Sequence, residues 1–134
     1  MKPFQKIQAV ILAVTVCGLT VGALALAQNP EADITGFYNE KDGEFFQIVK
    51  NGASYRVLWR YRAGDWVGVA IRDGDRFAIG WQRSDRANLG VSLYTIEKGE
   101  KGPRMVGGWA AYPGGGIAPD TLNFSRRAGA QAAD

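Results

Sequence analysis

The feature that most constrains the fold is a series of tight-turn signals spaced about ten residues apart. They are Lys41-Asp42-Gly43, Asn51-Gly52, Ala63-Gly64-Asp65, Asp73-Gly74-Asp75 and Lys98-Gly99-Glu100. Asn-Gly and Asp-Gly supply the positive φ angles that two-residue hairpin turns require. Short strands joined by such turns at regular spacing are typical of an antiparallel β-sandwich or β-barrel.

The runs between the turns are rich in β-branched and aromatic residues. They predict eight strands, at roughly 34–40, 44–50, 53–62, 66–72, 75–83, 89–97, 104–112 and 120–126. Short links between them predict an up-and-down meander, and closing the meander into a barrel removes the exposed strand edges. We therefore expect an all-β fold, a small closed or nearly closed antiparallel barrel of about eight strands. A two-sheet sandwich stays open, since strand count and turn spacing do not separate the two.

Alternation of apolar and polar residues assigns faces to the middle strands. Because side chains alternate across a strand, one apolar parity packs on the core. This parity predicts inward positions in three successive strands: Tyr55, Val57, Trp59 and Tyr61; Val67, Val69 and Ile71; Phe77, Ile79 and Trp81. The sixth and seventh strands alternate less cleanly, and bulges near Gly90 and Gly107-Gly108 would switch their faces partway.

Residues 1–27 form a membrane-targeting segment. Lys2 and Lys6 precede an uncharged run from Ile7 to Ala27, which ends in the small-x-small pattern Ala25-Leu26-Ala27. That pattern indicates a cleaved signal peptide. The run is also long enough to span a bilayer, which about 20 residues do, so a retained transmembrane helix is the alternative. Both place the following domain outside the cytoplasm, either periplasmic or secreted, or anchored in the inner membrane through residues 7–27.

The remaining boundaries follow from composition. Residues 28–33 are expected to be a linker, 34–126 the barrel domain, and the small polar stretch 127–134 a flexible tail. Without Lys2 and Lys6 the chain keeps 14 of its 16 basic residues against 13 acidic ones. Such balance does not provide the concentrated basic face that nucleic-acid binding needs, so no nucleic-acid partner is expected.

Missing residue types exclude most catalytic chemistry. The chain has no histidine, and its one cysteine, Cys17, lies in the targeting segment. Ser-His-Asp and Cys-His catalysis, and the usual zinc, copper and haem ligand sets, are therefore excluded. Asp73 and Asp75 are interpreted as turn residues rather than as a calcium site, which needs more oxygen ligands. We expect no enzyme activity, no metal and no cofactor.

Aromatic residues are the first group of candidate binding residues. Trp59, Trp81 and Trp109, with Tyr61 beside them, would line a ligand cavity in a barrel or fill its core. Trp66 falls on the opposite parity next to a turn. An exposed tryptophan there would indicate contact with a partner or a membrane interface.

Arginines are the second group. Arg56, Arg60 and Arg62 share one face of the third predicted strand, with Arg72 and Arg76 on its neighbours. A row of guanidinium groups would bind an anionic ligand or a lipid headgroup. The alternative is a solvated outer face whose charges are balanced by acids.

Two resemblances to known families add to this interpretation. The segment Ile34-Thr35-Gly36-Phe37-Tyr38-Asn39 resembles the first strand of the avidin-like and lipocalin-like (calycin) barrels, which open with a glycine, one residue and an aromatic. The resemblance implies a barrel; the other avidin ligand positions are not matched, so biotin binding is not implied. Over roughly residues 36–124 the chain is similar to an exported bacterial β domain without assigned function. That similarity rests on the segments Gly68–Trp81 and Gly90–Glu97, the pair Gly108-Trp109, and Asp120–Leu122.

The sequence leaves three functional hypotheses. The first is a non-enzymatic accessory module that binds a protein partner, within an inner-membrane complex if residues 7–27 are retained. The second is a lipocalin-like carrier of a small apolar ligand held among Trp59, Trp81 and Trp109. An enzyme is the third, and the missing histidine and cysteine disfavour it.

Overall fold

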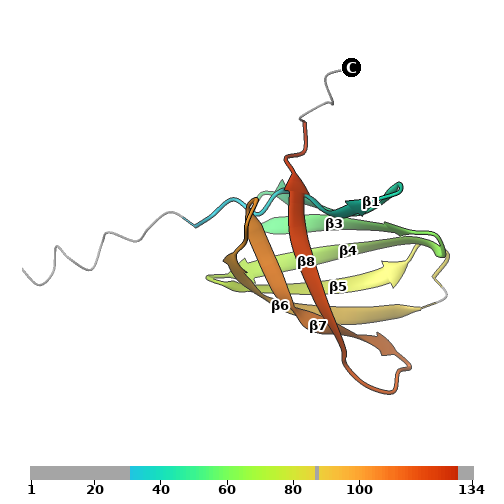
Figure 1. The fold of residues 1–134 in the computed structure, drawn as a ribbon. Helices are drawn as coiled ribbons and strands as arrows, with labels where there is room; N and C mark the ends of the chain where they lie inside the picture. Colours follow the sequence, from blue (N-terminus) through green and yellow to red (C-terminus); the bar gives the residue numbers. More distant parts are fainter. Residues whose placement is uncertain (1–30, 87, 130–134) are drawn as a thin grey trace, which may run out of the picture. The chain divides into compact units, whose positions relative to one another are not determined.

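The computed structural model describes residues 31–86 and 88–129, and these form an antiparallel eight-stranded barrel (Figure 1). Its strands are β1 (Gly36–Lys41), β2 (Glu44–Asn51), β3 (Ser54–Tyr61), β4 (Gly64–Asp73), β5 (Arg76–Arg83), β6 (Leu89–Lys98), β7 (Pro103–Tyr112) and β8 (Ala118–Arg126). Each strand pairs with the next, and β8 pairs with β1 to close the barrel. The predicted strand number, meander order and all-β class are confirmed, and the fold is a barrel rather than a sandwich.

Several predictions about the chain ends fall outside the described residues. They concern the targeting segment 1–27, most of the linker 28–33 and the last part of the tail 127–134. Among the residues that the structure describes, no helix has the length and apolar character needed to cross a membrane.

The first hairpin shows how the turn residues set the register. Asp42 and Gly43 both have positive φ, 53° and 83°. That combination is the signature of the type I′ turn, whose twist matches that of the strands it joins. Lys41 therefore pairs directly with Glu44 across a two-residue loop.

Tyr38 anchors the seam where β1 and β8 close the barrel. Its side chain is fully buried, and its hydroxyl donates a 2.7 Å hydrogen bond to the carbonyl of Ile34. Its ring meets those of Phe46 and Phe124 edge-on, at centroid distances of 6.5 and 5.6 Å. The aromatic residue that carries the calycin resemblance thus lies in the core at the closing seam.

The rest of the core is a single apolar cluster inside the barrel. Its buried members come from the chain just before β1 and from every strand: Ile34, Tyr38, Phe46, Ile48, Tyr55, Val57, Ala70, Phe77, Ile79, Trp81, Tyr94, Met105 and Leu122. The inward positions predicted for the third and fifth strands are confirmed, except that Tyr61 at the end of β3 is 45% exposed.

The predicted orientation of the fourth strand is wrong. Val69 and Ile71 are 64% and 63% exposed, whereas Ala70 between them is 2% exposed. The inward positions of β4 include Gly68 and Ala70, and the missing side chain of Gly68 leaves room for Val57 of β3 and Ile79 of β5. A Cβ atom on Gly68 would lie 2.7 Å from the carbonyl oxygen of Gly80 and 2.8 Å from Val57 Cγ2. Small barrels alternate small and large interior residues in this way.

The ambiguous sixth and seventh strands keep one register throughout. β6 pairs with β7 from Leu89↔Tyr112 to Lys98↔Pro103 without a shift, so the bulges considered near Gly90 and Gly107 are absent. Ser92 and Tyr94 face the interior, and Val91 and Leu93 face outward. Four branched residues that hydrophobicity alone would assign to the core are therefore on the surface. They are Val69 and Ile71 of β4, and Val91 and Leu93 of β6.

Gly90 and Gly80 provide a matched test of this orientation. A methyl group on inward-facing Gly90 would overlap the indole of Trp81 and the carbonyl of Ala110, whereas one on outward-facing Gly80 would meet nothing within 4 Å. We expect Gly90→Ala to lower the free energy of unfolding by about 2 kcal/mol. Gly80→Ala should change it by less than about 0.5 kcal/mol. Urea denaturation of both variants measures this, and equal effects would contradict the assignment of faces.

Candidate functional site

The four tryptophans form one continuous set of ring contacts at the barrel interior. The Trp59 ring centroid lies 5.8 Å from that of Trp66 and 6.4 Å from that of Trp81, and Trp81 lies 6.1 Å from Trp109. Tyr61 packs on this set at the end of β3, 5.6 Å from Trp59. Aromatic pairs at these distances stabilise a core beyond the area they bury.

The most deeply buried indole of this cluster has a hydrogen-bond partner inside the protein. Trp81 is buried and donates from its indole nitrogen to Ser92 Oγ at 3.0 Å. The cavity beside Phe46, Trp59 and Leu122 has a volume of about 20 Å³. That is room for one water molecule. The packing therefore supports the core-filling interpretation of these aromatic residues.

Trp66 was expected on the outside, and this expectation is wrong. Because β4 has the opposite orientation, Trp66 points inward and packs against the core. Its indole nitrogen donates to Asn88 Oδ1 at 3.3 Å, and the guanidinium of Arg83 lies 5.7 Å from its ring centroid. Trp66 is thus not an exposed contact residue.

Two arginines of the predicted guanidinium row, Arg60 and Arg62, are engaged in ion pairs. Arg60 binds Asp65 through two hydrogen bonds of 3.0 and 3.1 Å, and these hold the pKa of Asp65 below its usual value. Arg62 lies 3.6 Å from a carboxylate oxygen of Glu44. Arg72 lies on the face of β4 that carries Ala70, opposite to Val69 and Ile71, and it donates to the carbonyls of Gly74 and Ala32. The structure therefore does not bring these side chains together as an anion site.

A part-buried polar pair joins β6 and β8 across Gly107 of β7. Tyr94 and Asp120 both pair with Gly107, which has no side chain, so the phenol of Tyr94 reaches Asp120 Oδ2 at 2.7 Å. Burial raises the pKa of Tyr94 well above its usual range, and the Asp120 carboxylate raises it further. Burial likewise raises the pKa of Tyr38. Both phenols are therefore held neutral as donors.

These two tyrosines predict alkaline unfolding with a definite sign. Since their folded pKa values lie above the ordinary 10.0, their stabilising contribution is complete below about pH 10 and is lost as the pH rises through the folded values. We expect the free energy of unfolding to fall above about pH 10, and to fall less steeply in Tyr94→Phe. Urea denaturation at a series of pH values from about 8 to 11 tests this. Identical slopes in the two proteins would contradict it.

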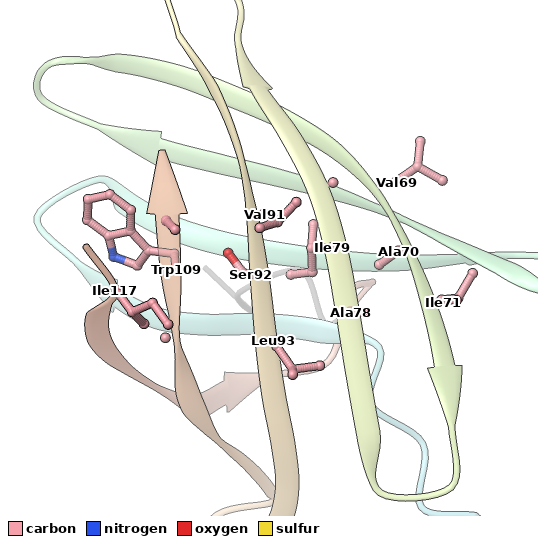
Figure 2. A pocket seen from close by; sticks show the side chains of 13 residues that line it. Val69, Ala70, Ile71, Ala78, Ile79, Val91, Ser92, Leu93, Trp109 and Ile117 are labelled. Atoms are coloured by element: carbon pink, nitrogen blue, oxygen red, sulfur yellow. The ribbon is translucent and has the colours of Figure 1, made fainter. Parts of the chain in front are cut away.

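The candidate binding surface lies on the outside of β4 to β7. Figure 2 shows Val69 and Ile71 projecting from β4, and Val91 and Leu93 projecting from β6. These four side chains are between 59% and 64% exposed. A depression with a volume of about 670 Å³ lies between them and Ile117, which is 80% exposed. A second depression of about 540 Å³ continues it past Val67 and Leu89.

The pairing of the strands arranges this surface in three cross-strand rows. We call these twelve positions the outer apolar face: Val67, Gln82, Leu89 and Tyr112; Val69, Gly80, Val91 and Ala110; Ile71, Ala78, Leu93 and Gly108. None carries a charge. Designed soluble surfaces aim for about 25–35% charged residues, so a neutral area of this extent is a candidate interaction site.

The outer apolar face is also corrugated. Branched side chains on β4 and on β6 form two ridges. Ala78 and Gly80 on β5 form the floor of the groove between them. On β7, Gly108 is buried, and a Cβ atom on it would lie 2.9 Å from Ile117 Cγ2, so Ile117 covers this part of the face.

Sequence reasoning did not find this face. Its signal was present in the paired small and branched residues of β4 and β6, which permit either orientation. In the described residues, no cluster of three or more acidic, histidine or cysteine side chains suited to a metal ion occurs. No protein-family model, curated protein or solved structure matches the chain.

Proposed function

We propose that this protein is a non-enzymatic, exported β-barrel module that binds a protein partner through its outer apolar face. The observation that carries the proposal is that the twelve neighbouring positions of the outer apolar face carry no charge. Export rests on the targeting segment 1–27, which places the barrel in the periplasm or at the inner membrane. The proposal adds no catalytic role, because the chain has no histidine and no cysteine outside that segment.

The size of the face supports a macromolecular partner. Its large side chains and Ile117 are between 39% and 80% exposed. At on the order of 100 Å² for a fully exposed branched side chain, they present roughly 500 Å² of apolar surface. The largest apolar patch of a typical monomer is about 300–600 Å² and is often functional. Leaving this surface in water is unfavourable, and a protein that covers it removes that cost.

The carrier alternative receives less support from the geometry. A cavity ligand would have to enter among Trp59, Trp81 and Trp109, whose rings already contact one another. Ligand pockets for small molecules usually have volumes of about 300–1,000 Å³. The cavity beside Trp59 is far smaller than this, at about 20 Å³.

A charge placed on the face tests the proposal directly. Leu93→Glu puts a carboxylate at the centre of the surface, where Leu93 is 59% exposed. Gln47→Glu is the matched control, since it adds the same side chain to the outward face of β2, across the barrel. After in-cell cross-linking and purification of the full chain in mild detergent, we expect the wild type and Gln47→Glu to give the same cross-linked species. Leu93→Glu should lose it; identical cross-linking in all three proteins would overturn the proposal.

A further inference from the structure

We propose that the barrel contains a gate between β1 and β8, a gap in the wall that side chains close where backbone pairing stops. The gate goes beyond the proposed function, since it involves none of the residues of the outer apolar face. It follows from the origin of the hydrogen bonds that cross this seam.

Backbone pairing across the seam ends early. In the direction of β1, the last pair with β8 is Tyr38↔Phe124. The next residue, Asn39, has a φ of 50°, and the pairing of β1 with β2 shifts register between Tyr38 and Lys41. Such a bulge bends its strand. β1 therefore parts from β8 beyond Tyr38, while the first half of β8, Ala118 to Asn123, stays paired with β7 (Figure 1).

The side chain of Asn39 takes the place of the missing backbone groups. Its carboxamide nitrogen donates to the carbonyl of Thr121 at 2.9 Å, and its carboxamide oxygen accepts from the N–H of Asn123 at 2.9 Å. A neighbouring strand would offer the edge of β8 the same kinds of donor and acceptor. Asparagine suits this position because it tolerates positive φ and its short side chain bonds readily to backbone groups.

Two further contacts hold the seam, and both also depend on side chains. The N–H of Glu40 donates to Ser125 Oγ at 3.1 Å. The Glu40 carboxylate pairs with the guanidinium of Arg126 at 2.9 Å, and that guanidinium lies 4.0 Å from the ring centroid of Phe37. Since these contacts lie at the surface, water can replace each partner. Separating them therefore costs less than separating a buried backbone ladder.

A polar cavity lies behind the seam. It is the cavity of about 20 Å³ beside Trp59, and Asn39 of β1 and Asp120 of β8 both line it. The carboxylate of Asp120 accepts from the N–H of Thr121 at 2.9 Å and from the phenol of Tyr94 at 2.7 Å. The cavity has room for one water molecule. Separation of Asn39 from β8 would thus let water reach the Tyr94–Asp120 pair while the rest of the barrel stays folded.

Residue-resolved hydrogen exchange of the full chain in mild detergent tests the gate. If the seam opens as one unit, the amides of Glu40, Thr121 and Asn123 exchange through one shared local opening. Asn39→Gly keeps the positive φ and removes the carboxamide. We expect exchange at least about tenfold faster at Glu40 and Thr121, although their own hydrogen-bond partners remain. Asn51→Gly makes the same substitution in the β2–β3 hairpin and should leave these rates unchanged.

Ser125→Ala gives the reciprocal measurement. It removes the partner of the Glu40 amide, and faster exchange at Asn123 as well would support a shared opening. Acceleration confined in each variant to the amide that lost its partner would overturn the gate, since the contacts would then open separately. Equal acceleration of all slowly exchanging amides, those of β3 and β4 included, would also overturn it, because the wall would then yield only by global unfolding. Unchanged rates in Asn39→Gly would have the same consequence.

Discussion

Replacing Trp81 with alanine is expected to lower the free energy of unfolding by about 3–5 kcal/mol. The indole is 7% exposed, contacts the rings of Trp59 and Trp109, and donates to Ser92. Its removal would leave a cavity in the barrel that the fixed strand pairing cannot close. Ser92 would also lose its hydrogen-bond donor inside the core.

Chemical denaturation measures this effect, and Tyr112→Ala is the control. Tyr112 is a large aromatic residue that is 71% exposed on the outer face. Its replacement should change the free energy of unfolding by about 0.5 kcal/mol or less. If Trp81→Ala cost no more than Tyr112→Ala, the assignment of the tryptophans to a filled core would be wrong. The carrier hypothesis would then gain support, because a tryptophan lining an open cavity contributes little packing.

Tyr38→Ala is expected to have an effect of the same size, about 3–5 kcal/mol, for a different reason. Tyr38 is fully buried where β1 and β8 close the barrel, and it packs edge-on against Phe46 and Phe124. Without the ring, the seam loses its edge-on contacts with Phe46 and Phe124 and keeps a cavity at its centre.

Tyr38→Phe divides this effect into its parts. Phenylalanine keeps the ring and removes only the hydroxyl that donates to Ile34 at 2.7 Å. Since an intramolecular hydrogen bond contributes about 1 kcal/mol on balance, we expect the free energy of unfolding to fall by about that amount. Urea denaturation of both variants gives the comparison. A loss in Tyr38→Phe as large as in Tyr38→Ala would show that the hydrogen bond, rather than the ring, holds the seam.

The strand order was predictable because the turns are local. Asp42-Gly43 and similar pairs need positive φ, and this need is readable from the residues without knowledge of the rest of the chain. Eight strands in meander order follow from the spacing of these turns. Barrel closure is less local, since it depends on β1 meeting β8 through Tyr38 and Phe124.

The orientation of β4 was not predictable from its own pattern. Alternation of Val67, Val69 and Ile71 with Gly68 and Ala70 shows two faces, and hydrophobicity alone assigns the branched face to the core. The deciding fact is the packing of the neighbouring strands, since a Cβ atom on Gly68 would lie 2.8 Å from Val57 Cγ2 and 3.0 Å from Ile79 Cγ2. A strand's own sequence does not contain that fact, because register with neighbours determines it.

The candidate binding surface escaped prediction for the same reason. The orientation predicted for β4 was wrong, and that of β6 was left open; with Val69, Ile71, Val91 and Leu93 outward, these strands present the outer apolar face. Trp66 moves the other way, from expected exposure to packing against the core. Arg60 and Arg62 were placed correctly on the outside, but their partners Asp65 and Glu44 emerged only from the pairing of strands.

Carbene footprinting of the full chain tests the central claim most directly, because it reports which side chains are covered in solution. The reagent labels exposed apolar side chains wherever water reaches them. We predict that Val69 and Val91 are protected in the associated wild type and become labelled in Leu93→Glu, while Tyr61 is labelled equally in both. Equal and extensive labelling of Val69 and Val91 in the two proteins would contradict the account, since the outer apolar face would then be open to solvent and bind nothing.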